Sequence, residues 1–215
     1  MLKVIVADDE DLVRSSLRTI LSSAPDVEVV AECADGNGVA EVVRLHRPHV
    51  VLLDIRMGDT DGITALRAIT ALPDPPAVCM LTTFDMDDYV RRALRLGAAG
   101  FLLKDVDPAY LIKAVHDLAS GGVVLDPTVA ARVVNAMTTG EREAEPARER
   151  LATLSDRERE VVTLIGRGLS NAEIGRELHL SETTVKGYVS AVLGKIGASN
   201  RVQAALVAYR GGLIA

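Results

Sequence analysis

The sequence is poor in aromatic residues and cysteine, and it lacks long apolar runs. Aromatic residues make up 3% of its 215 residues and tryptophan is absent, so Ala, Val and Leu must do most of the packing. Its two cysteines, Cys33 and Cys79, lie in or beside apolar runs, which favours reduced buried thiols over a disulfide. No apolar run approaches the ~18 residues of a membrane span, and no charged-then-apolar leader opens the chain. We therefore expect a cytoplasmic protein with no membrane partner.

The net charge of −6 is unevenly distributed along the chain. Residues 1–125 hold 12 basic and 19 acidic side chains, residues 126–152 hold 4 and 5, and residues 153–215 hold 8 and 6. These three segments therefore carry −7, −1 and +2. An acidic front segment would repel nucleic acid, whereas the mildly basic end permits nucleic-acid binding without establishing it.

The front of the chain alternates between apolar runs and helical patterns. Short runs rich in β-branched residues are each followed by an amphipathic stripe or by helix-capping residues. The expected strands are residues 2–7, 27–31, 50–54, 77–81 and 100–103. Strands that alternate with helices of this length predict a flavodoxin-like α/β fold, with a doubly wound parallel sheet of five strands.

Polar side chains follow four of the expected strands, at the point where each strand ends. Asp8 and Asp9 follow the first, Asp54 ends the third, and Thr82 and Lys104 follow the last two. The carboxyl ends of parallel strands meet at one sheet edge, so these side chains should converge. Neighbouring carboxylates need a cation to offset their charge, and Mg²⁺ accepts carboxylate and phosphate oxygens as ligands. A lysine and a hydroxyl suit the remaining oxygens of a phosphoryl group.

These side chains lie in motifs that resemble the receiver domain of two-component response regulators. The matching stretches are Val6-Ala7-Asp8-Asp9-Glu10, Leu53-Asp54-Ile55-Arg56-Met57, Asp61-Gly62, Leu81-Thr82-Thr83-Phe84-Asp85 and Gly97-Ala98-Ala99-Gly100-Phe101-Leu102-Leu103-Lys104-Asp105. The resemblance implies that a sensor histidine kinase phosphorylates Asp54. The implied ligands of Mg²⁺ are Asp8, Asp9, Asp54 and the main-chain carbonyl of Arg56.

The same resemblance assigns roles to residues on the last two strands and marks one departure. It implies that Thr82 and Lys104 bind the phosphoryl oxygens and that Phe101 is the rotating switch aromatic. Gly58 stands where the family usually has proline, four residues after the acceptor. The substitution makes the loop after the acceptor more flexible but removes no chemical group.

The composition and periodicity of the sequence change after the fifth expected strand. Residues 126–139 predict a short helix, and the polar, mixed-charge stretch that follows is typical of a solvated linker. The expected parts are a receiver domain at 1–122, a partly helical linker at 123–151 and a small all-α domain at 152–215. In this last part Ser155 with Glu158, and Ser170 with Glu173, have the spacing of capping boxes.

A helix that opens at Ser181 has two contrasting faces. Its apolar stripe consists of Val185, Val189, Val192 and Ile196. The opposite face carries short polar groups and one cation, Lys186, which suits a helix placed in the major groove of DNA. An ordinary amphipathic surface helix would show the same stripe, so periodicity alone leaves both readings open. Gly175 and Gly194 lie inside predicted helices, where we expect close helix contacts.

Residues 152–215 resemble the helix-turn-helix domain of the LuxR/NarL type. The matching stretches are Leu154-Ser155-Asp156-Arg157-Glu158-Arg159-Glu160-Val161, Gly168-Leu169-Ser170-Asn171-Ala172-Glu173-Ile174, Leu180-Ser181-Glu182-Thr183-Thr184-Val185-Lys186, Lys195-Ile196-Gly197 and Arg201-Val202-Gln203-Ala204-Ala205. The resemblance implies a homodimer that forms on phosphorylation and binds two-fold-related half-sites in double-stranded DNA. The expected DNA contacts are Asn171, Thr183, Thr184, Lys186, Gly187, Tyr188 and Ser190. Gly187 and Ser190 are smaller than the residues of many relatives, so DNA shape should contribute more to recognition.

Two other functions compete with a phosphorylation-controlled transcription regulator. A phosphotransferase or phosphatase of the haloacid dehalogenase type would form an aspartyl-phosphate, but it places a second Asp two residues after the nucleophile, where this chain has Arg56. An atypical regulator would keep the fold without phosphorylation, but the complete set of acidic, hydroxyl and lysine residues disfavours it. Asp54 would react once as a nucleophile without turning over an external substrate, so we expect no enzyme.

Overall fold

The computed structural model of the chain describes residues 1–58, 61–82, 87–125, 144–198 and 200–214. The described residues form two compact units, the first built from Met1–Ala119 with the strand Val124–Leu125, and the second mainly from residues 144–214. Within these described ranges, every helix is too short or too polar to cross a membrane. The short helix predicted at 126–139 lies outside the described residues.

The first unit is built around a parallel sheet with the strand order β2-β1-β3-β4-β5-β6. Its strands are β1 Leu2–Ala7, β2 Val27–Cys33, β3 Val50–Asp54, β4 Ala77–Thr82, β5 Gly100–Leu103 and β6 Val124–Leu125. The expected flavodoxin-like order is confirmed, but the expected count of five strands is wrong by one. β6 pairs with β5 through two residues only, which is too short to show a strand pattern in the sequence.

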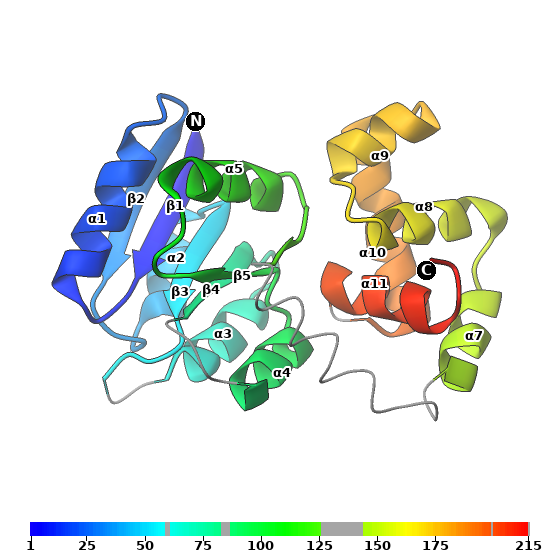
Figure 1. Cartoon of the computed structure of the whole chain (residues 1–215), viewed down its shortest axis with the longest axis horizontal. Helices are drawn as coiled ribbons and strands as arrows, with labels where there is room; N and C mark the ends of the chain where they lie inside the picture. The colour runs from blue at the N-terminus through cyan, green and yellow to red at the C-terminus, as the bar shows by residue number, and fades with distance from the viewer. Residues whose placement is uncertain (59–60, 83–86, 126–143, 199, 215) are drawn as a thin grey trace. The chain divides into compact units, whose positions relative to one another are not determined.

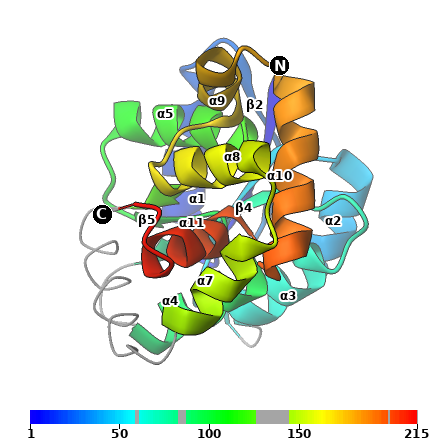
Figure 2. The same cartoon turned by 90° about the vertical axis from the view of Figure 1, so that its right-hand side faces the viewer.

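Helices cover both faces of this sheet (Figure 1, Figure 2). They are α1 Asp11–Ser22, α2 Val39–His46, α3 Gly62–Thr70, α4 Asp87–Leu96 and α5 Pro108–Ala119. α1 and α5 share one apolar cluster with the strands, while α3 contacts α2 and α4 on the other side. The result is a three-layer α/β unit whose central strands are buried on both faces.

The central strand β3 is apolar until its last residue, which is acidic. Val50 to Leu53 are fully inaccessible, and Asp54 at the end of the strand is 4% exposed. The backbone of Gly62 lies so close that a Cβ atom there would overlap the carbonyl oxygen of Asp54. Glycine at the start of α3 therefore lets that helix begin directly against the carboxyl end of β3.

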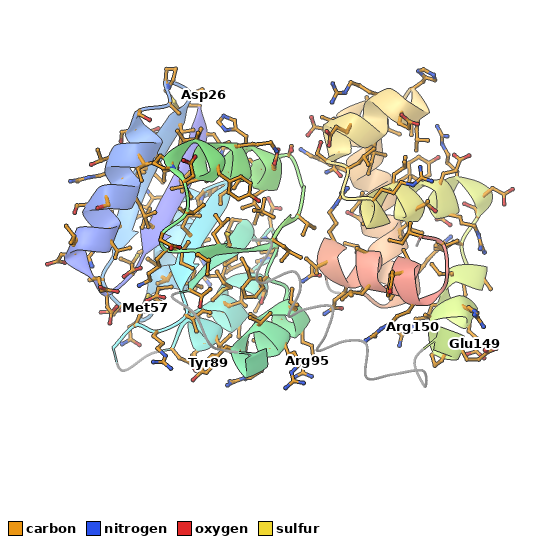
Figure 3. The ribbon with its side chains drawn as sticks, in the orientation of Figure 1. Asp26, Met57, Tyr89, Arg95, Glu149 and Arg150 are labelled. Atoms are coloured by element: carbon orange, nitrogen blue, oxygen red, sulfur yellow. The ribbon has the colours of Figure 1, made fainter. Side chains whose placement is uncertain are left out.

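A polar contact ties α5 to the turn between α1 and β2. Nε2 of His116 lies 2.8 Å from Oδ2 of Asp26, and its Nδ1 lies 2.8 Å from the carbonyl oxygen of Ile112. Figure 3 labels Asp26 at that turn. The hydrogen bond to Asp26 is the main cause that raises the pKa of His116, and it lowers the pKa of Asp26 in return.

The second unit consists of helices around a small apolar core (Figure 2). They are α7 Ala144–Ala152, α8 Asp156–Gly166, α9 Asn171–Leu178, α10 Glu182–Ile196 and α11 Arg201–Arg210. Both predicted capping boxes are present, at Ser155 with Glu158 and at Ser170 with Glu173. α7 lies in the range assigned to the linker, and its Leu151 is buried in this core.

The two glycines inside the predicted helices differ in their surroundings. A Cβ atom at Gly175 would lie 2.7 Å from the carbonyl oxygen of Leu180, so the expected close approach is confirmed. A Cβ atom at Gly194 would meet nothing within 4 Å, so the expectation of a tight contact there is wrong. Gly194 is exposed on α10, and nothing in the structure explains why a glycine occupies it.

Candidate functional site

The predicted site residues meet at the carboxyl edge of the sheet. Asp8 and Asp9 follow β1, Asp54 ends β3, Thr82 ends β4 and Lys104 follows β5. Register explains the convergence, because Asp54 pairs with Leu81 of β4 and Thr82 pairs with Leu103 of β5. A pocket of about 280 Å³ opens at this edge. Its lining residues are Asp9, Glu10, Asp54, Ile55, Arg56, Thr82 and Lys104.

Lys104 holds three carboxylates at the centre of this edge. Its Nζ lies 3.0 Å from Oδ2 of Asp54, 2.8 Å from Oδ2 of Asp8 and 3.0 Å from Oε1 of Glu10. Burial alone would lower the pKa of the Lys104 ammonium, but the three carboxylates outweigh it and raise the pKa above its usual value. Lys104 therefore stays charged and offsets part of the negative charge of the cluster.

The surroundings of Asp54 shift the pKa of its carboxyl in opposite directions. Burial is the largest cause and raises the pKa of the Asp54 carboxyl above its usual range. The hydrogen bond from Lys104 acts against this shift, while the charge of Asp8 adds to it. Asp54 is thus a desolvated carboxyl with one ammonium beside it.

The acidic cluster has the donor set of a hard divalent cation. One carboxylate oxygen from each of Asp8, Asp9 and Glu10 lies within 4.8 Å of the others. Oδ2 of Asp8 is buried and lies 2.8 Å from Nζ of Lys104, so the ammonium offsets part of the charge of this cluster. Three carboxylates so close together supply the oxygen ligands that Mg²⁺ accepts, so the residues present fit Mg²⁺. The predicted ligand Asp54 reaches this cluster through Lys104 rather than by direct contact.

Four further residues complete the account of this edge. Glu10 belongs to the acidic cluster although no site role is predicted for it, and the signal for it is its place in the acidic run after β1. Thr82 is 6% exposed and lines the pocket, as does the exposed Arg56. Phe101, the predicted switch residue, is fully buried on β5 and does not line the pocket.

In the second unit, α10 presents the exposed face that the sequence predicts. Thr183, Thr184, Lys186, Gly187 and Ser190 are exposed, and Tyr188 is half-buried. On the other side of the helix Val185, Val192 and Ile196 are buried in the core, with Val189 half-buried. Nζ of Lys186 lies 3.2 Å from Oε1 of Glu182 one turn earlier, so the single cation of this face has an anionic partner.

Asn171 differs from the other predicted DNA contacts. It is 4% exposed at the start of α9, and its Oδ1 accepts a hydrogen bond of 2.8 Å from Arg201. Arg201 also donates to the carbonyl oxygen of Leu169. The structure therefore does not place the Asn171 side chain on the exposed face with the α10 residues. It joins the ends of α9 and α11 instead.

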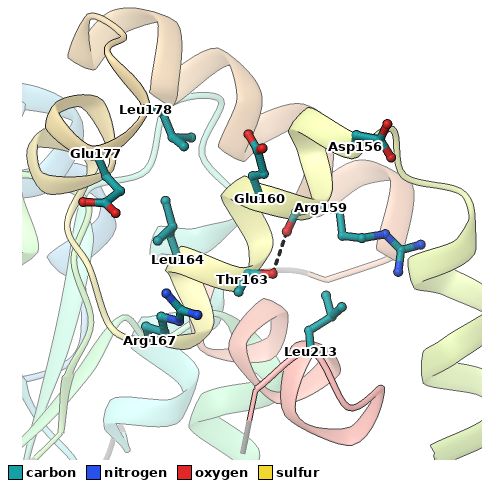
Figure 4. Close-up of a pocket in the computed structure, with 9 residues that line it drawn as sticks. All are labelled: Asp156, Arg159, Glu160, Thr163, Leu164, Arg167, Glu177, Leu178 and Leu213. Carbon is teal, nitrogen blue, oxygen red and sulfur yellow. Dashed lines mark hydrogen bonds between the residues drawn. The ribbon is translucent and has the colours of Figure 1, made fainter.

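The second unit has a hollow beside α8 (Figure 4). Figure 4 shows the Thr163 hydroxyl donating to the carbonyl oxygen of Arg159 across one turn of that helix. The residues that line the hollow are Asp156, Arg159, Glu160, Thr163, Leu164, Arg167, Glu177, Leu178 and Leu213. Its charges are mixed and it contains none of the predicted DNA contacts, so it does not have the uniform positive charge of a phosphate-binding groove.

Comparisons with known proteins assign a family to each of the two units. A family model for the response regulator receiver domain matches residues 4–116, and one for bacterial regulatory proteins of the luxR family matches residues 152–208. The chain is 37% identical to the transcriptional regulatory protein LnrK of Bacillus subtilis, over 99% of both chains. It is 34% identical to the DNA-binding transcriptional activator DevR/DosR of Mycobacterium tuberculosis, over 97% of this chain and 94% of that one.

Solved structures show the same resemblance. The response regulator ChrA of a heme-sensing two-component system is 35% identical, with a TM-score of 0.54 over 99% of this chain and 98% of that chain. The matches in sequence and in structure therefore both extend over nearly the whole chain.

Proposed function

Because this chain belongs to the two-component response regulators that join a receiver domain to a LuxR-type DNA-binding domain, we propose that phosphorylation of Asp54 controls its binding to DNA. A sensor histidine kinase is the phosphoryl donor. The single observation that carries the proposal is the placement of Asp54, Thr82 and Lys104 beside an acidic cluster at one sheet edge. The receiver comprises residues 1–122, the linker 123–151 and the DNA-binding domain 152–215.

The geometry supports a simple phosphoryl transfer. An oxygen of the Asp54 carboxylate forms a bond to phosphorus while the bond from phosphorus to the imidazole nitrogen of the donor breaks, leaving the electron pair on that nitrogen. The Lys104 ammonium, 3.0 Å from Asp54, favours the ionised nucleophile and is placed to pair with a phosphoryl oxygen. The Thr82 hydroxyl lines the same pocket and is a second donor.

Asp8, Asp9 and Asp54, with the main-chain carbonyl of Arg56, would hold Mg²⁺ at this edge. When bound, the cation supplies positive charge that offsets the carboxylates and polarises the phosphoryl oxygens. The acidic cluster supports this role, because it brings one oxygen each of Asp8, Asp9 and Glu10 within 4.8 Å of one another.

Chemical phosphorylation tests the acceptor directly. A small phosphodonor with Mg²⁺ should add one acid-stable, base-labile phosphoryl group to the wild type and none to Asp54→Asn, measured by intact mass. Asp74→Asn, which removes an exposed carboxylate of the same unit, is the matched control and should label fully. Stoichiometric labelling of Asp54→Asn would disprove the assignment. A chelator should block labelling of the wild type.

The readout of phosphorylation is dimerisation, which brings two copies of α10 to two-fold-related DNA half-sites. Reorientation of Thr82 and Phe101 shifts an existing equilibrium toward a form with a dimer surface, either on α1 and α5 or on α4 and β5. Sedimentation of matched phosphorylated and free samples measures this step. Identical masses up to the concentrations used for DNA binding would refute it.

A further inference from the structure

Gly58 makes an unexpected contact with the acidic cluster. It lies in the loop between β3 and α3, four residues after Asp54, and its backbone N–H donates to Oδ2 of Asp9 at 3.1 Å. Its φ is +47°, in the left-handed region that glycine adopts readily. A Cβ atom there would meet nothing within 4 Å, so conformation rather than space explains the glycine. A proline at this position could neither adopt this conformation nor make this contact, because its φ is fixed near −65° and it has no N–H.

The position of the Asp9 carboxylate depends more on this one hydrogen bond than the positions of the Asp8 and Glu10 carboxylates depend on theirs. Asp8 is buried and accepts a hydrogen bond from the backbone N–H of Glu10 at 2.9 Å, and Glu10 itself pairs with Lys104. Asp9 is exposed, and within the described parts of the chain Gly58 is its only hydrogen-bond donor. Without that N–H, nothing among the described residues would fix the rotamer of the Asp9 carboxylate.

We propose that Gly58 is a positioning residue of the divalent-cation site, whose N–H holds the Asp9 carboxylate toward Asp8 and Glu10 before the cation arrives. The inference rests on the proposed function of the acidic cluster. An exposed carboxylate must lose rotamer freedom when it binds a cation, and a fixed donor reduces that loss in advance. Donors outside the ligand shell that orient a ligand typically change metal affinity 10- to 100-fold.

The contact also links the cation to the loop that follows the phosphoacceptor. Residues from Asp54 to Gly58 span that loop's first part, and the backbone N–H of Gly62 donates to the carbonyl oxygen of Ile55 at 2.8 Å. The loop is thus tied at Ile55 to the start of α3 and at Gly58 to Asp9. Cation binding at Asp9 should therefore stiffen the backbone beside Asp54.

Titration of the full-length protein with Mg²⁺ alone, followed by backbone amide shifts, tests the proposal without any phosphorylation. Gly58→Pro removes the N–H and should weaken Mg²⁺ binding about tenfold or more. Gly58→Asn is the matched control, because asparagine keeps the N–H and tolerates a left-handed φ, and it should bind within about twofold of the wild type. Gly58→Ala keeps the N–H at a strained φ and should fall between the two.

Each outcome of this titration either supports or overturns the proposal. Equal Mg²⁺ affinity of Gly58→Pro and the wild type overturns the proposal, and so does a Gly58→Asn variant as weak as Gly58→Pro. If Gly58→Pro unfolds at the wild-type temperature in a chelator but binds Mg²⁺ more weakly, its defect lies in the positioning of Asp9 and not in the fold. If Gly58→Pro unfolds, Gly58→Ala binding more weakly than Gly58→Asn supports the proposal, and equal binding overturns it. A wild type that binds no Mg²⁺ would instead disprove the proposed function of the cluster.

Discussion

Replacement of Lys104 by methionine tests how far one ammonium stabilises the acidic edge. The side chains of Asp8 and Asp54 are 0% and 5% exposed, and both lie within 3.0 Å of Nζ of Lys104. Removing one partner of a buried ion pair destabilises a protein by about 3–5 kcal/mol, because the remaining charge is left unpaired. The edge borders an open pocket, so we expect the lower end, about 3 kcal/mol. That loss lowers the folded-to-unfolded ratio of the receiver by roughly two orders of magnitude.

The pH dependence of this loss has a definite sign. Burial already raises the pKa of Asp54, and loss of Lys104 removes the main group that opposes the shift. A carboxyl whose pKa is higher in the folded state than in the unfolded state binds protons more tightly when folded, so stability falls as pH rises. The deficit of Lys104→Met should be complete above the folded pKa of Asp54 and should shrink as pH falls through it. Adding Asp54→Asn should recover part of the loss at neutral pH.

Hydrogen exchange followed by mass spectrometry measures the stability of the receiver separately within the full-length chain. Amides of β1 and β3, which lie at the centre of the sheet, should exchange about 100-fold faster in Lys104→Met when exchange follows unfolding of the unit. Lys113→Met is the matched control, because Lys113 is 68% exposed and its pair with Asp117 spans one helical turn. Such pairs contribute under about 0.5 kcal/mol. Exchange in Lys104→Met within threefold of the wild type would refute the reasoning.

Further predictions concern the other contacts described above. If Lys186 contacts a phosphate, Lys186→Ala should reduce the salt slope of DNA binding by about one charge. If Lys186 reads a guanine, the variant should lose about 1–3 kcal/mol of binding free energy on the operator alone. Unchanged affinity on both operator and scrambled DNA would show that α10 does not face DNA. Glu182→Gln should raise affinity for scrambled DNA, because it frees Lys186. Asp26→Asn should lower the pKa of His116 measured by NMR, and an unchanged value would contradict the contact. Gly175→Ala should destabilise the second unit by about 1–3 kcal/mol in thermal unfolding, because its methyl would crowd the Leu180 carbonyl.

The convergence at the sheet edge could be predicted because parallel register is regular. Once β1, β3, β4 and β5 are recognised as parallel neighbours, the residues that end them must share one edge. The caps at Ser155 and Ser170 were equally predictable, since a serine and a glutamate three residues apart satisfy each other's backbone partners locally. The first depends on the regular topology of a parallel sheet and the second on a local rule, and neither needs knowledge of side-chain packing.

What the sequence could not predict depends on contacts between distant segments. The Gly58 contact joins residues 49 positions apart, and the Asn171 contact with Arg201 spans 30. Asn171 follows the capping serine of α9 in a motif typical of DNA contact, but the side chain turns to the buried guanidinium of α11. Strand β6 was missed for a different reason, because two residues are too few to show periodicity.

The charge of the α10 face gives a physical reason for coupling DNA binding to dimerisation. Between residues 181 and 194 this helix carries one cation, Lys186, and its partner Glu182 lies 3.2 Å away. Each phosphate that a protein neutralises adds to affinity through release of one counterion, so a single α10 face with one paired lysine gains little. Two faces joined in a dimer make the second binding event intramolecular, and the combined affinity can then exceed that of one face by orders of magnitude. Under the proposed function, a weak α10 face would keep the free monomer off DNA, and phosphorylation would control occupancy by changing how many faces bind together.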